Sequence, residues 1–201
     1  MIRSVSFAAA LAILSISSIA SAAETQVLNV KDGMAFGDII SYGECFQKEV
    51  IIVASEQQYK QGSGGPVWAA SGFMIVADSD LCLGTQVAEI GEIQITSFTV
   101  SSMQTARVVG TVQLVNFSTF ESRTAAFDLS FQGSGDINRG VTHTNEEFPG
   151  GRIVAHTNGT SRFALVTGFV TAADGSNFIE GATGVGGISR VISGSVTKII
   201  N

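Results

Sequence analysis

The stretch Thr105–Phe117 reads TARVVGTVQLVNF and decides the fold class. Small and apolar residues fill every second position, and a more polar set lies between them: the apolar face holds Ala106, Val108, Gly110, Val112 and Leu114. A period of two is typical of a β-strand that buries one of its faces. Thr124–Phe131 repeats the alternation, so the middle of the chain is expected to form strands.

The same kind of signal recurs on both sides of this stretch, with glycine-rich or polar turns between the runs. Further strands are expected at Gln26–Val30, Lys48–Ser55, Val67–Ala77, Gln86–Val100, Arg152–Thr171 and Ile188–Ile200. Within Arg152–Thr171, the dipeptide Asn158-Gly159 predicts a hairpin turn, because both residues tolerate positive φ. Asp174-Gly175 predicts another turn.

No long stretch has the spacing of an amphipathic helix, and glycine and β-branched residues interrupt each candidate. At most, a short helical turn is expected near Phe36–Tyr42 or Glu56–Gln61. The chain is therefore expected to be all-β: an antiparallel up-and-down barrel or a barrel-like β-sandwich, built as a single domain. The long strands and short turns of the second half favour the barrel.

Four phenylalanines on the alternating faces are expected to fill the core or to line a ligand cavity: Phe127, Phe131, Phe163 and Phe169. An outer-membrane barrel is the alternative for an exported all-β chain. Such barrels carry girdles of Tyr and Trp, whereas this chain has two Tyr and one Trp, so the alternative is disfavoured.

The N-terminus has the three parts of a secretory signal peptide. Arg3 supplies the positive start, an apolar stretch runs to Ile19, and Ala20-Ser21-Ala22 supplies the cleavage site. We expect a signal peptide at residues 1–22 and one all-β domain at residues 23–201. The protein is accordingly predicted to be secreted or periplasmic, with no transmembrane helix after cleavage.

Charge argues against a nucleic-acid partner. The chain has a net charge of −6, and loss of Arg3 leaves ten Lys and Arg against seventeen Asp and Glu, or −7. Binding to phosphate backbones needs clustered Lys and Arg. The basic residues here are scattered along the sequence.

Cys45 and Cys82 are the two cysteines. In an oxidising compartment, an isolated pair predicts a disulfide bond.

The most polar and chemically varied window runs from Asp136 to His156. Its two histidines, His143 and His156, flank a turn expected at Phe148–Gly151, which could bring the imidazoles together. The candidate ligand-binding residues are His143, Glu146, Glu147, His156, Arg139 and Arg152. Two His and a carboxylate suit a divalent metal or acid/base chemistry. Because the spacing matches no known motif, no metal, cofactor or catalytic residue is assigned.

These features favour a non-catalytic binding or interaction protein, with a small apolar ligand or a surface partner. Two alternatives stay open. One is an adhesin-like or pilin-like surface and assembly subunit. The other is a small metal-dependent or acid/base enzyme that uses the His143/His156 window.

Overall fold

The computed structural model describes residues 25–179 and 181–199, so the expected signal peptide lies outside the described residues. Eight antiparallel strands follow one another around a single closed sheet. They are β1 (Thr25–Tyr42), β2 (Phe46–Gln61), β3 (Val67–Asp80), β4 (Thr85–Ser101), β5 (Thr105–Asn116), β6 (Ser122–Phe148), β7 (Gly151–Ala172) and β8 (Gly184–Ile199). Because β1 also pairs with β8, the meander closes into a barrel. The barrel prediction is therefore confirmed over the sandwich.

The core fills the barrel interior with the alternate residues predicted from the sequence. On β5, Ala106, Val108, Val112 and Leu114 are buried. The facing positions of β6 are also buried, with Phe127 and Phe131 among the largest side chains of the core.

Gly110 sits opposite Phe127 in this pairing. A Cβ atom at position 110 would lie 2.8 Å from the Phe127 ring and 2.2 Å from the Gln94 carbonyl oxygen. The glycine therefore leaves the room that the aromatic ring occupies.

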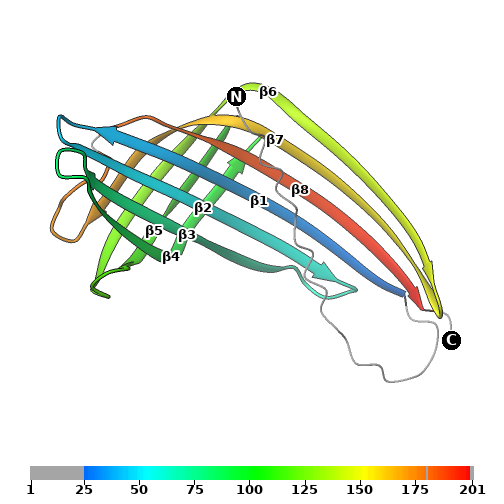
Figure 1. Cartoon of the computed structure of the whole chain (residues 1–201). Helices are drawn as coiled ribbons and strands as arrows, with labels where there is room; N and C mark the ends of the chain where they lie inside the picture. Colours follow the sequence, from blue (N-terminus) through cyan, green and yellow to red (C-terminus); the bar gives the residue numbers. More distant parts are fainter. Residues whose placement is uncertain (1–24, 180, 200–201) are drawn as a thin grey trace.

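Five strands run well past the ring and form a curved sheet that projects from one end of the barrel (Figure 1). The order across this extension is β2, β1, β8, β7 and β6. The first part of β3 lies beside β2 but has separated from β4, because the β3–β4 pairing ends at Phe73 and Glu92. On the other side, β6 leaves β5 near a bulge between Ser134 and Ile137. The inner face of the extension is thus continuous with the barrel interior and open to solvent.

The opposite end of the barrel is covered. In the connection between β7 and β8, Phe178 and Ile179 are buried in the core. The Arg123 guanidinium lies over the Phe178 ring and pairs with the carboxylate of Glu89. The Cys45–Cys82 disulfide joins two turns at this end, which confirms the predicted bond.

Several local predictions are wrong. Asn158 and Gly159 do not form a turn, because both pair with β8 in the middle of β7. The turn between β6 and β7 lies at residues 149–150, where Gly150 has a φ of 91°, and this confirms the other turn expected, at Phe148–Gly151. The short helical turns expected at Phe36–Tyr42 and Glu56–Gln61 are parts of β1 and β2.

The prediction for the phenylalanines is correct for two of the four. Phe127 and Phe131 are buried, whereas Phe163 and Phe169 are 69% and 44% exposed on the outside of the barrel. On β7 the alternate residues Ala164, Val166 and Val170 fill the interior instead.

Candidate functional site

The six residues singled out from the sequence lie in the β6–β7 hairpin of the extension. Alternation along the strands places five of them on its inner face: Arg139, His143 and Glu147 on β6, and Arg152 and His156 on β7. Glu146 lies on the opposite face of the sheet and is not part of the same surface.

The two histidines are direct cross-strand partners. Their Nδ1 atoms are 3.0 Å apart, and the ring centroids are separated by 4.4 Å. A hydrogen bond between two Nδ1 atoms needs a proton on one of them and a free lone pair on the other, so at least one ring is neutral in this geometry.

Asn158 contacts the other ring nitrogen of His156. Its side-chain Nδ2 lies 2.7 Å from Nε2 of His156. If the amide donates to Nε2, the ring proton of His156 is on Nδ1 and the imidazole donates to His143. Within the described ranges, no group of three or more His, Cys, Asp or Glu side chains is placed to hold a metal ion.

Arg152 is held by a different neighbour. Its Nε donates a hydrogen bond of 2.8 Å to Oδ1 of Asn145, although its cross-strand partner is Glu147. The guanidinium is exposed, as is Arg139 two strand rows from the histidines.

The larger feature of this region escaped the sequence prediction. Seven cations share the inner face of the extension and the adjoining mouth of the barrel, and we call this surface the basic face. Its members are Lys31, Lys60, Arg139, Arg152, Arg162, Arg190 and Lys198. Two carboxylates, Glu56 and Glu147, also point to this face. Seven positive and two negative side chains give the described part of the face a net charge of +5.

These cations form no ion pair among the described residues, although Glu147 is the cross-strand partner of Arg152. Elsewhere in the barrel, Arg107 pairs with Asp128, and Arg123 pairs with Glu89 at 2.6 Å. In the described ranges no such ion pair is formed by the seven cations of the basic face. Arg162 instead donates from Nε to the carbonyl oxygen of Gly135 at 3.0 Å. Unpaired like charges on one face repel one another and attract an anion.

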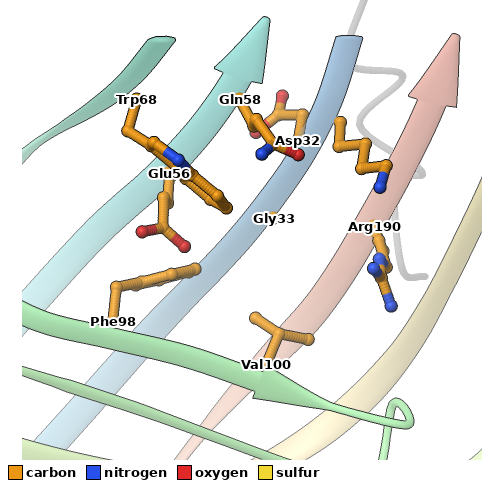
Figure 2. A pocket seen from close by; sticks show the side chains of 9 residues that line it. Asp32, Gly33, Glu56, Gln58, Trp68, Phe98, Val100 and Arg190 are labelled. Carbon is orange, nitrogen blue, oxygen red and sulfur yellow. The ribbon is translucent and has the colours of Figure 1, made fainter. Parts of the chain in front are cut away.

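A cavity of about 190 Å³ lies where the basic face meets the barrel mouth. Figure 2 shows Trp68 and Phe98 on one side, Glu56 and Gln58 on β2, and Arg190 on β8 across from them. Phe98 reaches over β1 to a position where Gly33 has no side chain, 3.2 Å from where a Cβ would be. The cavity therefore combines an aromatic wall with charged groups at its rim.

Asp32 also borders this cavity. Burial raises the pKa of its carboxyl above the usual value, and a hydrogen bond with the Gln57 side chain opposes the rise only in part. One carboxylate oxygen is buried without a hydrogen-bond partner. The ionised carboxylate is therefore a cost to the folded state at neutral pH.

Replacing Asp32 with asparagine should therefore stabilise the protein at pH 7, because the amide removes the buried charge. A folded-state pKa above the unfolded one means that protonation favours the folded state. The gain should fade as the pH falls through the raised pKa and vanish below 3.8, where Asp32 is protonated in both the folded and the unfolded state and is as neutral as asparagine. Urea unfolding at pH 7 and at pH 3.5 measures this difference. A variant that is less stable than the wild type at pH 7 would contradict the assignment.

Comparison with family models, with curated proteins and with solved structures found no match for this chain. In the part of the chain that the structure describes, no helix has the length and apolar character needed to cross a bilayer.

Proposed function

We propose that this chain is an exported, non-catalytic binding protein that holds an anionic ligand on the basic face. The observation that carries the proposal is the collection of seven cations on one face of a chain whose net charge is −6. A surface with one sign of charge next to a low-dielectric barrel attracts and concentrates ligands of the opposite sign.

The chemistry of the cations supports an acidic ligand group. Four of the seven are arginines, whose planar guanidinium donates two parallel hydrogen bonds to a carboxylate, phosphate or sulfate. Arg139 and Arg190 lie in one cross-strand row, with Thr160 between them. Neighbouring strands are about 4.8 Å apart, so the two guanidinium groups start about 10 Å from each other and can converge on one anion.

The disulfide is compatible with an oxidising compartment such as the periplasm or the extracellular space. Export is part of the proposal and rests on the signal peptide predicted from the sequence.

The test uses Trp68, the single tryptophan of the chain, as a fluorescent reporter in the cavity. Dextran sulfate and uncharged dextran are titrated into the secreted protein at about 50 mM salt. The sulfated polymer should bind and the neutral one should not. Affinity should fall steeply as salt is added, since the contacts are electrostatic.

Two matched double variants distinguish binding by the basic face from a general effect of the protein's net charge. Arg139→Gln with Arg190→Gln should weaken binding of dextran sulfate at least tenfold. Lys48→Gln with Arg107→Gln removes the same charge, and Lys48 lies twelve residues from Lys60 along β2, about 40 Å away. This control should change the affinity less than twofold. An equal loss in both double variants, or no binding by the wild type, would overturn the proposal.

A further inference from the structure

We infer that the ligand of the basic face is an anionic amphiphile, an acyl chain that ends in a phosphate or carboxylate group. This inference rests on the proposed function and adds the class of ligand. It comes from a second set of side chains on the same face. Five exposed aliphatic residues alternate with the cations: Ile137, Val141, Val154, Ile192 and Val196.

These aliphatic residues are not covered by other parts of the described chain. Val141 is 60% exposed, and Val154 and Val196 are 45% and 41% exposed. Val154 and Val196 are cross-strand partners, and Val196 also pairs with Val27 on β1. A row of three valines thus crosses three neighbouring strands, with Val154 and Val196 exposed to solvent and Val27 half-buried. Apolar surface of this kind is stabilised when a ligand removes it from water.

The other face of the same strands is mixed in chemistry and carries no cation in the extension. There β8 has Ser189, Ser193 and Ser195 beside Val191, and β7 has Thr157 and Ser161 beside Ile153. Only the inner face of the extension therefore combines the cations with exposed aliphatic residues, which suits a ligand with both an apolar part and a charge.

The arrangement along the strands matches such a ligand. Arg139 and Arg190 lie in a row near the barrel mouth, one step beyond the row of Arg162, and Arg152 and Lys198 lie in a row near the tip. The valine row lies between these two positions. Four two-residue steps separate the charged rows, or about 27 Å. An acyl chain of one bilayer leaflet covers about 15 Å, half of the hydrocarbon core. The face can therefore seat the chain along the aliphatic residues with its acidic group at one end.

A hydrophilic polyanion does not account for the aliphatic residues. Proteins that bind single-stranded nucleic acids stack successive bases on aromatic side chains. In the described part of this face, Trp68 and Phe98 lie at the barrel mouth and the His143–His156 pair lies farther along the extension, so no series of rings follows the strands for successive bases to stack on.

The test compares ligands that share a headgroup or a tail, followed by Trp68 fluorescence and by calorimetry. The set is dodecyl phosphate below its micelle concentration, butyl phosphate, and dodecyl maltoside as the uncharged control. Dodecyl phosphate should bind at least tenfold more tightly than either of the other two, because only it engages both sets of side chains.

Two double variants test the aliphatic row itself. Val154→Thr with Val196→Thr keeps the shape and the β-branching but adds hydroxyl groups, and should reduce the affinity for dodecyl phosphate about tenfold while leaving that for butyl phosphate unchanged. The control, Val30→Thr with Val191→Thr, makes the same change on the other face of β1 and β8 and should have little effect.

The outcomes separate the inference from the proposed function. If butyl phosphate and dextran sulfate bind, but the dodecyl tail adds nothing, the amphiphile is wrong and the anion-binding function stands. If no anion binds, both are wrong. Binding to phosphatidylglycerol vesicles without binding to monomeric dodecyl phosphate would also overturn the inference, since it would indicate attachment to a membrane surface.

Discussion

Replacing Phe127 with alanine should lower the free energy of unfolding by about 3–5 kcal/mol, the range for deleting a buried phenylalanine. The ring lies inside the barrel and is 1% exposed. It fills the space that Gly110 leaves on the facing strand. The backbone of a closed barrel is fixed by hydrogen bonds on both sides of each strand, so the walls cannot collapse into the void. Urea unfolding followed by circular dichroism measures the loss.

The matched control is Phe163→Ala, which removes the same side chain from the outside of the barrel. Phe163 is 69% exposed, so its loss should cost less than about 1 kcal/mol. The comparison tests which face of the β6 and β7 strands points inward. Equal losses for the two variants, or a larger loss for Phe163, would contradict the packing described above.

The fold class could be predicted from the sequence because alternation is a local signal. In Thr105–Phe117, one set of alternate residues is small or apolar and the other carries polar and charged groups such as Arg107 and Gln113. A strand with this pattern has one favourable orientation. The buried positions of β5 follow it without exception among Ala106, Val108, Val112 and Leu114.

The same rule failed on β7 because both faces of this strand are apolar. Phe163 and Phe169 alternate with Ala164, Val166 and Val170, and the larger side chains suggested the core. The interior of an eight-stranded barrel has limited room, and Phe127 and Phe131 from β6 already occupy it. The smaller residues of β7 therefore face inward, a choice that depends on the neighbouring strand and not on the local sequence.

Strand pairing also outweighed the turn propensity of Asn158-Gly159 in β7. Asn158-Gly159 is a strong hairpin signal in isolation, yet both residues are paired on two sides, with Val141 and Gly140 on β6 and with Ile192 and Val191 on β8. Pairing along the full length of three long strands outweighs a preference confined to two residues. Pro149 and Gly150 supply the turn instead.

The basic face shows why the site was only partly predictable. Its seven cations are spread from Lys31 to Lys198 and form no cluster in the sequence. Strand register brings them together, and register is a property of strand pairs. One clue was available in the sequence. Arg190 and Lys198 are separated by even numbers of residues from Ile188, Ile192 and Val196, so all five side chains point to the same face of one strand. The acidic net charge concealed the feature, because the carboxylates lie mostly elsewhere.

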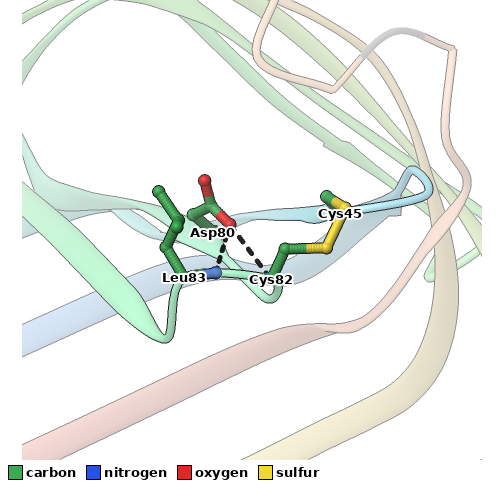
Figure 3. The surroundings of a disulfide bond; sticks show 4 residues. All are labelled: Cys45, Asp80, Cys82 and Leu83. Carbon is green, nitrogen blue, oxygen red and sulfur yellow. Dashed lines mark hydrogen bonds between the residues drawn. A yellow bond between two sulfur atoms is a disulfide. The ribbon is translucent and has the colours of Figure 1, made fainter.

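The disulfide provides the second large effect. Replacing Cys45 and Cys82 with alanine should lower the free energy of unfolding by about 3–4 kcal/mol, because the bond closes a loop and restricts the unfolded chain. The two cysteines are 37 residues apart in sequence and lie on the β1–β2 and β3–β4 turns. Figure 3 shows the bond beside Asp80, which accepts hydrogen bonds from the backbone amides of Cys82 and Leu83.

Because the disulfide lies far from the basic face, its loss should lower stability without changing anion binding. The turns that it joins are at the covered end of the barrel, and the basic face is at the other end, where the strands extend past the ring. Under native conditions, the double alanine variant should therefore bind dextran sulfate with an affinity within twofold of the wild type, while its urea midpoint falls. Reducing the wild type should reproduce the lower midpoint, and the reductant should not change the variant. A variant that kept the wild-type midpoint would refute the stabilising role of the bond. One that lost binding while still folded would instead place the disulfide in the binding surface, at odds with an anion held on Arg139 and Arg190.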